Sequence, residues 1–258
     1  MPKINKDSTL NITLVGVGLC LLCSAIISFI AIQLRSVQEN NVVLDMQKKI
    51  VSSAGLEEFY GSVENAMSNI KTIIIDLDKG EIVDISPDSY ELAKELREDG
   101  KYKFLSAEED IASIKKREKY SKIYIEYKDN KINTLILPVR GYGLWGILYG
   151  YLAIEGDFNT VAGLEFYEHK ETPGLGAEID NPKWKALWKG KKIYQENGNV
   201  SLKVIKGSVQ KTSSNYNYEI DGLSGATLTC NGVSNLIAYW MGNDGFLNFI
   251  NNLQKIDV

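Results

Sequence analysis

Residues 122–154 read KIYIEYKDNKINTLILPVRGYGLWGILYGYLAI. Three runs in this stretch, at 122–127, 132–139 and 147–154, are rich in β-branched, aromatic and aliphatic residues, which is the composition of strands. The first two runs are joined around Asp129-Asn130-Lys131 and the last two by a glycine-rich turn. Because short connections of this kind join neighbouring antiparallel strands, the stretch predicts the centre of an antiparallel sheet.

On the N-terminal side of this stretch the sequence predicts a hairpin. Apolar runs at 70–77 and 81–85 flank Asp78-Lys79-Gly80, and aspartate and glycine between two apolar runs are typical of a hairpin turn. Helical spacing of apolar residues marks three further segments, which are residues 43–55, 88–98 and 108–116. The first of these helices is expected to end near Gly55, before a polar stretch that reaches residue 68.

On the C-terminal side a short helix is predicted at 182–189, with Asn181 as its N-cap and Gly190 as its stop. Trp184 and Trp188 lie four residues apart and would pack this helix onto the sheet. Two more strands and two closing helices are expected at residues 201–206, 216–220, 232–241 and 245–254. Strands and helices do not alternate as in a βαβ fold, and the chain has no P-loop or GxGxxG fingerprint. The fold class is therefore α+β, with an antiparallel sheet and flanking helices.

The 258-residue chain carries a net charge of only −4, which does not point to nucleic acid. Residues 10–34 contain no Asp, Glu, Lys or Arg, and about 20 apolar residues are enough to cross a bilayer as a helix. A signal peptide is one alternative, but its apolar region is shorter, about 7 to 15 residues. A buried helix of a soluble protein is the other alternative, but the run is too apolar on all its faces to favour it. We expect a retained transmembrane helix.

Cysteine and histidine are scarce, which limits metal chemistry. Cys20 and Cys23 lie in the apolar run, and Cys230 is the only cysteine outside it. The Cys-x-x-Cys spacing allows a metal site shared with another chain, or two polarizable side chains of a membrane helix. With His169 as the only histidine, a histidine-rich metal site is excluded, and we predict no metal site in this chain.

Residues 221–227 read Asp-Gly-Leu-Ser-Gly-Ala-Thr. Gly222 and Gly225 allow the backbone to take positive φ and approach a ligand, while Ser224 and Thr227 present hydroxyl groups. The same residue types also form tight turns before helices without any ligand. From this motif alone, a ligand site and a simple helix-capping turn are both open.

A helix is expected to begin within about a turn of Thr227. Apolar side chains recur at helical spacing downstream, at Val233, Leu236, Ile237 and Trp240. Thr227, Thr229 and Asn231 are the candidate N-caps. The free backbone N–H groups of a helix N-terminus favour a phosphate, so the motif suits a phosphorylated ligand.

Two other segments have the composition of a pocket for a planar ring. Tyr142 and Trp145 stand among glycines between two predicted strands, where they could stack on a flat ligand or fill a corner of the sheet. Residues 171–176, Glu-Thr-Pro-Gly-Leu-Gly, form a rigid loop whose exposed backbone could hydrogen-bond the edge of such a ring, or an ordinary loop. His169, beside this loop, is either a proton donor or a hydrogen-bonding residue.

Taken together, these motifs resemble one family along almost the whole chain. They are Lys6-Asp7-Ser8, Leu44-Asp45, Ala54-Gly55-Leu56, residues 141–146, the block from His169 to Gly176 with Trp184, Trp188 and Gly190-Lys191, and Asp221 to Thr227. The sequence resembles the FMN-binding subunits of membrane electron-transfer complexes, specifically the NqrC family of the sodium-translocating NADH:quinone reductase. The resemblance implies FMN joined through its phosphate to Thr227. It also implies a cofactor-binding set of Asp221, Ser224, Gly225, Ala226, Thr227, Tyr142, Trp145, Glu171, Thr172, Gly174 and Leu175.

The resemblance also implies a function and a location. The chain would relay single electrons to a flavin on another protein of a complex with six subunits, in which NADH oxidation and quinone reduction drive Na⁺ export. A separate flavin transferase would install the FMN. Charges flank the apolar run on both sides and do not decide its orientation; the family places the large domain outside the cytoplasm, anchored to the bacterial inner membrane. We expect a tail at 1–9, a transmembrane helix at 10–34, a helical connector at 35–68 and an α+β domain at 69–258, with the FMN-binding region at about 130–258.

Two alternatives remain at this point. The G-type FMN carrier of an Rnf ferredoxin:NAD electron transport complex shares the Ser-Gly-Ala-Thr motif and a similar loop. A membrane-anchored sensory or binding domain without a cofactor would need only the apolar run, the hairpins and the aromatic loops.

Overall fold

The computed structural model describes residues 8–256, which form two compact units that divide after Met46. The first unit consists of the N-terminal part of the long helix α1 (Thr9–Ser53). By length and composition α1 can cross a membrane, as the apolar run predicts. Residues 1–7 of the predicted N-terminal tail lie outside the described residues.

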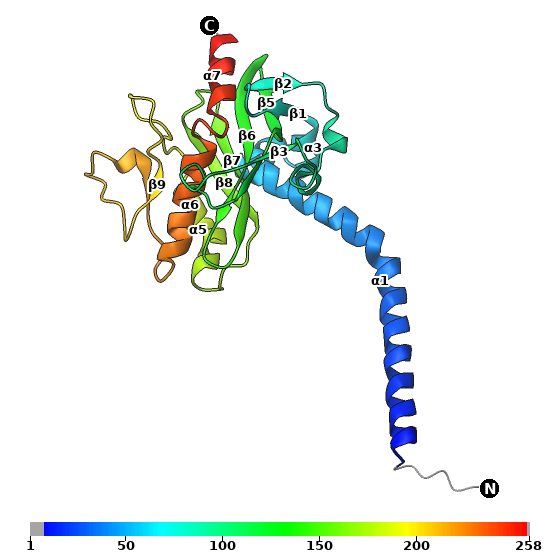
Figure 1. The fold of residues 1–258 in the computed structure, drawn as a ribbon. Coiled ribbons are helices and arrows are strands. Elements are labelled where there is room, and N and C mark those ends of the chain that lie inside the picture. The colour runs from blue at the N-terminus through cyan, green and yellow to red at the C-terminus, as the bar shows by residue number, and fades with distance from the viewer. Residues whose placement is uncertain (1–7, 257–258) are drawn as a thin grey trace, which may run out of the picture. The chain divides into compact units, whose positions relative to one another are not determined.

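The second unit is built on a six-stranded, fully antiparallel sheet (Figure 1). In spatial order its strands are β2 (Glu81–Val83), β1 (Ile70–Asp76), β5 (Tyr120–Lys128), β6 (Lys131–Tyr142), β7 (Ile147–Glu155) and β8 (Val161–Glu168). The three predicted central strands and the predicted hairpin are confirmed. In the hairpin turn the Asp76 carboxylate accepts hydrogen bonds from the N–H groups of Asp78 and Lys79, and Gly80 takes a φ of 66°.

The sheet is buried on both faces, because alternate residues of its central strands point to opposite sides. Leu135 and Leu137 of β6 belong to the larger core, whereas Ile136 between them belongs to the smaller one. Strand β7 shows the same alternation, with Leu152 in the larger core and Tyr151 in the smaller. A shift of one residue in register would exchange the two cores, so the pattern fixes the register.

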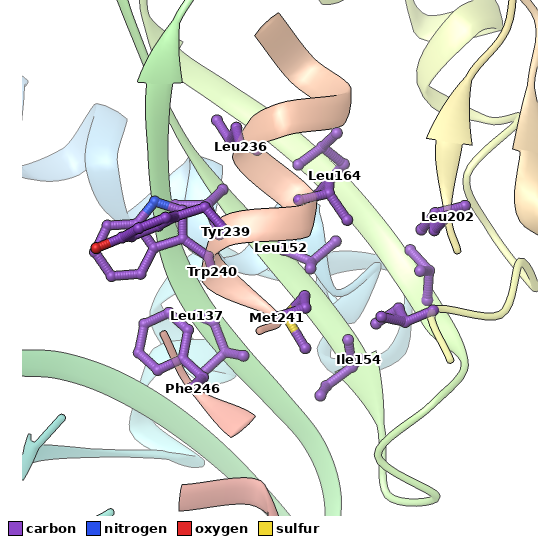
Figure 2. Packing of buried hydrophobic residues seen from close by; sticks show 14 of the residues in the cluster. Leu137, Leu152, Ile154, Leu164, Leu202, Leu236, Tyr239, Trp240, Met241 and Phe246 are labelled. Carbon is purple, nitrogen blue, oxygen red and sulfur yellow. The ribbon is translucent and has the colours of Figure 1, made fainter. Parts of the chain in front are cut away.

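Helix α6 (Thr227–Trp240) covers the face with the larger core. Figure 2 shows Leu236, Trp240 and Met241 directed toward the sheet residues Leu137, Leu152 and Ile154. The helix lies very close to the end of β6, since a β-carbon at Gly141 would stand 2.7 Å from Leu236 Cβ. Helices α5 (Pro182–Lys185) and α7 (Leu247–Ile256) also contribute side chains to this core.

The opposite face is covered by the last turns of α1, from Gln47 onward, with α2 (Leu56–Tyr60) and α3 (Val63–Ser68). The end of α1 packs closely against β8, because Gly163 of β8 faces the carbonyl of Ser53 and a side chain would not fit between them. The buried carboxylate of Glu165 binds both Ser52 Oγ, at 3.0 Å, and Lys185 Nζ, at 2.6 Å. Glu165 thus joins the end of α1 to α5 through β8.

The predicted helices at 88–98 and 108–116 are largely wrong. The first segment contains only the 3₁₀ turn η1 (Pro87–Ser89) and the single turn α4 (Leu92–Glu95). The second forms turns, because the Asp110 carboxylate binds the N–H groups of Ile114 and Lys115 and so competes with helix formation. It then enters β4 (Lys116–Glu118), which pairs with β3 (Tyr102–Phe104).

The C-terminal part differs from the prediction in further places. Strand β8 was not predicted at all. The strands expected at 201–206 and 216–220 shorten to β9 (Lys203–Val204) and β10 (Glu219–Ile220), which pair in parallel, while Tyr216–Tyr218 form the 3₁₀ helix η3. The short helix near 182 begins as expected with Asn181 as N-cap, and Trp184 and Trp188 are buried in the core.

A pair of leucines tests how α6 is held on the sheet. Leu236 is fully buried, whereas Leu228 on the same helix is 58% exposed. We expect Leu236→Ala to lower the free energy of unfolding by about 2–5 kcal/mol, because it removes buried methyl groups and leaves a cavity. Leu228→Ala should change it by less than about 0.5 kcal/mol. Urea titration of the detergent-solubilised chain, followed by tryptophan fluorescence, measures both; equal losses would contradict this packing.

Candidate functional site

The turn at residues 221–227 leads directly into α6. Gly225 adopts a φ of 73°, and Thr227 is the exposed first residue of the helix. The N-cap position is occupied by the buried Ala226, which provides no side-chain cap, so the three predicted N-caps are wrong. The backbone N–H groups of the first helical turn have no acceptor within the helix, and they lie beside the Thr227 hydroxyl.

Neighbouring segments fix the shape of this turn. The Asp221 carboxylate accepts a hydrogen bond from Val209 N–H at 2.8 Å, and the Asp221 carbonyl accepts one from Trp184 Nε1 at 2.8 Å. The N–H group of Leu223 lies 3.3 Å from Cys230 Sγ. Burial raises the pKa of the Cys230 thiol, which favours its protonated form. The thiol packs against the turn through its contact with Leu223.

A pocket of about 420 Å³ opens beside the turn. Its wall consists of residues 204–208, residues 222–225, Thr227, Cys230 and Asn231. Lys206 provides the positive charge of this wall and Ser208 a hydroxyl group. The combination of one cation, hydroxyl groups and a helix N-terminus suits a phosphate group.

The turn between β6 and β7 carries two exposed aromatic side chains. Tyr142 is 45% exposed and Trp145 is 62% exposed. Helix α6 packs directly against this turn, since the Cα of Gly232 faces the Tyr142 carbonyl with no room for a side chain. The aromatic turn is therefore fixed to the same helix that begins at Thr227.

Glu171 connects the aromatic turn to α6. Its Oε1 accepts hydrogen bonds from the N–H groups of Leu144, at 2.9 Å, and Trp145, at 3.0 Å. Its Oε2 accepts one from Thr229 Oγ1 at 2.5 Å. The side chain is buried, with 6% of the residue exposed, and its two oxygens accept from three donors.

The loop that follows Glu171 reaches the turn of residues 221–227. The Thr172 carbonyl accepts hydrogen bonds from Leu175 N–H and Ala177 N–H, and the chain then enters the 3₁₀ helix η2 (Gly176–Asp180). Gly174 has a φ of 74°. The exposed Leu175 side chain lies beside Gly225, where a β-carbon would be 2.9 Å from Leu175 Cδ2.

His169 closes the base of this loop. Its Nδ1 accepts a hydrogen bond from Glu171 N–H at 3.2 Å, and its Nε2 lies 2.7 Å from Asp180 Oδ2. An acceptor Nδ1 and a carboxylate at Nε2 assign the proton of the neutral ring to Nε2. Of the two predicted roles for His169, this geometry favours hydrogen bonding.

The structure brings most of the predicted site residues together. Thr227, Gly225 and Leu175 meet at the turn, and Glu171 links them to the turn that carries Tyr142 and Trp145. The Thr172 and Gly174 backbone shapes the loop between them. Ser224 is exposed and Ala226 is buried. The Asp221 carboxylate accepts a hydrogen bond from Val209 N–H.

Thr229, one of the three residues wrongly predicted as N-caps, has a different role in the structure. It is fully buried, and its hydroxyl hydrogen-bonds Glu171 instead of capping the helix. Thr229 shares the helical spacing of the buried residues Val233, Leu236 and Trp240. A hydroxyl on the apolar face of a helix requires a buried partner, and this spacing could have revealed its position.

Known proteins are similar to this chain in sequence and in fold. Residues 143–242 match the FMN-binding domain family. The chain is 47% identical over 256 residues to the C subunit of the Na(+)-translocating NADH-quinone reductase of Pseudomonas aeruginosa, with 97% of this chain and 98% of that relative covered. It is 39% identical over 246 residues to the protein of that name from Vibrio anguillarum, with 95% of each covered. The crystal structure of Shewanella oneidensis NqrC superimposes with a TM-score of 0.73 and 30% identity, over 81% of this chain and 96% of that chain.

Substitution of Glu171 tests its role as a link between segments. Glu171→Ala leaves the Leu144 and Trp145 N–H groups and the Thr229 hydroxyl without their acceptor, and should lower the free energy of unfolding by about 1–3 kcal/mol. Glu171→Gln is the matched control, because its amide oxygen can accept from the two N–H groups while its NH₂ donates to Thr229. Urea titration should give a clearly smaller loss for glutamine; an alanine variant as stable as wild type would refute the link.

Proposed function

The chain belongs to the NqrC family, the C subunits of the Na(+)-translocating NADH-quinone reductase, and on this premise we propose that it carries FMN esterified through its phosphate to Thr227. It is a subunit of an oxidoreductase complex with an FMN-binding domain. The observation that carries the proposal is the position of Thr227: an exposed hydroxyl on the first residue of α6, beside free N–H groups and a pocket.

The residues present fit the phosphate end of FMN. The first-turn N–H groups of α6 and Lys206 supply donors and positive charge for a phosphodiester. Gly225, with its positive φ and close approach to Leu175, leaves no room for a side chain between the turn and the loop. Ser224 offers a further hydroxyl at the edge of the pocket.

The aromatic turn and the 171–176 loop fit the ring end. Trp145 and Tyr142 present exposed aromatic surface on which a planar ring can stack, and Leu175 presents an exposed aliphatic side chain. The exposed backbone of Thr172 and Gly174 provides polar groups for the edge of the ring. These residues are proposed to orient the isoalloxazine and limit its contact with water.

FMN supplies one-electron transfer when it is bound. The described part of the chain shows no cluster of three or more His, Cys, Asp or Glu side chains suited to a metal ion. From its membership of the NqrC family, the protein is proposed to hold the flavin between an upstream donor and a flavin on another subunit. A covalent tether keeps the cofactor on the protein where no free flavin replaces it.

The location follows from α1 and the family. We propose that α1 anchors the chain in the bacterial inner membrane and that the domain faces the periplasm, among the other subunits of the complex, where a flavin transferase attaches the FMN. Residues 10–34 carry no ionisable carboxylate. NADH oxidation and quinone reduction in the complex are proposed to drive Na⁺ export, and no carboxylate in this segment suggests that it binds the ion.

The matches over nearly the full length of the NqrC relatives favour this family over the G-type carrier of an Rnf complex. The FMN-binding domain match opposes a domain without cofactor. Neither alternative is supported by a separate feature of the structure.

Loss of one hydroxyl tests the attachment site. The full-length chain is co-expressed with a flavin transferase in wild-type form, as Thr227→Val and as Thr212→Val, an exposed threonine outside the 221–227 motif. Wild type and Thr212→Val should gain the mass of FMN less one water, as expected for a phosphoester, and fluoresce on a denaturing gel. Thr227→Val should do neither while it keeps wild-type thermal unfolding, because it lacks only the acceptor oxygen. A fluorescent Thr227→Val band would refute the attachment site.

A further inference from the structure

Thr229 lies two residues after the proposed attachment site and points into the protein. The residue is 0% exposed, and its hydroxyl donates to Glu171 Oε2 at 2.5 Å. The two residues are 58 positions apart in the sequence. The hydrogen bond therefore connects the first turn of α6 to a different segment of the site.

Glu171 carries this connection onward to the aromatic turn. Its other oxygen holds the N–H groups of Leu144 and Trp145. Two glycines lie directly against the Glu171 carboxylate. A β-carbon at Gly143 would stand 2.6 Å from Glu171 Oε1. A β-carbon at Gly176 would stand 2.5 Å from Glu171 Oε2 and 2.6 Å from Thr229 Oγ1. A side chain would not fit at either glycine, and the hydrogen bonds to the carboxylate are direct.

The carboxylate depends on these neutral donors. Within the described part of the chain, Glu171 takes part in none of the ion pairs with lysine, arginine or histidine. A buried carboxylate without a cation is stabilised only by its hydrogen bonds. Thr229 supplies one of its three side-chain hydrogen bonds and the only one to Oε2 among the described residues, so loss of that hydroxyl would remove the hydrogen bond between the carboxylate and α6.

We propose that Thr229 is a positioning residue for the flavin. Through Glu171 it fixes the turn that bears Trp145 at a set distance from the start of α6, where Thr227 would hold the phosphate. The attachment point and the ring-binding surface are thereby held by one rigid unit. This inference rests on the proposed function, because it concerns the geometry of the flavin attached to Thr227.

The test compares flavin mobility in full-length variants co-expressed with a flavin transferase. Covalent loading is measured by intact mass, and motion of the ring by time-resolved fluorescence anisotropy of the flavin. Thr229→Val should load with FMN but show a larger fast-depolarising component, because the ring is tethered and its binding surface is displaced. Thr229→Ser, which restores a hydroxyl, should return the decay to that of wild type.

A matched control separates positioning from general loosening. Ser234 is also on α6, and its hydroxyl accepts from Val204 N–H at 2.9 Å and donates to Cys230 O at 2.9 Å. Ser234→Ala thus removes a hydrogen-bonded hydroxyl of the same helix without touching Glu171, and should leave the decay unchanged. A Ser234→Ala decay as altered as that of Thr229→Val would overturn the inference.

Other outcomes are equally decisive. A loaded Thr229→Val chain with the wild-type decay would overturn the inference and leave the attachment at Thr227 intact, whereas a wild type without covalent FMN would overturn the proposed function itself. If Thr229→Val does not fold, Thr229→Cys replaces it. Because the thiol is a weaker donor of similar size, that variant should show an intermediate fast component, and a wild-type decay would count against the inference.

Discussion

The buried carboxylate of Glu171 is the interaction on which the rest of the site depends. Three parts of the chain meet at its two oxygens: the loop it belongs to, the turn between β6 and β7, and the first turn of α6. The loop and the turn have little regular secondary structure at this point, whereas α6 is a helix packed on the sheet; all three segments carry residues proposed to bind FMN. This acidic side chain thus connects the 171–176 loop to both the aromatic turn and α6, which also pack against each other.

The sheet and α6 make this arrangement possible. The apolar residues of β6 and β7 build cores on both faces, and α6 lies against β6 so closely that glycine is required at Gly141. Because the helix cannot shift on the sheet without losing this contact, its N-terminus stays at a constant place next to the aromatic turn. A rigid scaffold with functional groups in its loops is a common way to build a binding site, and a redox relay benefits because electron transfer depends on the position of the ring.

The sequence predicted the parts of the structure that local patterns control. Runs of β-branched, aromatic and aliphatic residues identified the three strands at 122–154, and Asn181 identified the start of α5. The helix expected at 108–116 failed because the Asp110 side chain binds backbone N–H groups that a helix would use. Strand β8 was missed because Gly163 interrupts its run of strand-forming residues. Only glycine fits at this position, because the carbonyl of Ser53, which is distant in sequence, packs against it. For the same reason the motifs named Thr227 and Glu171 but not the hydrogen bond from Thr229, which exists only after folding.

The central claim is that FMN is attached to Thr227 at the start of α6, and the most direct measurement is the position of the modification in the sequence. Wild-type chain co-expressed with a flavin transferase is digested, and the fluorescent peptide that contains residues 221–227 is sequenced by tandem mass spectrometry. The account predicts fragment ions that assign the added mass, FMN less one water, to Thr227. Fragments that place it on Ser224 or on any other residue, or a peptide without the modification beside a flavinylated control protein, would contradict the account.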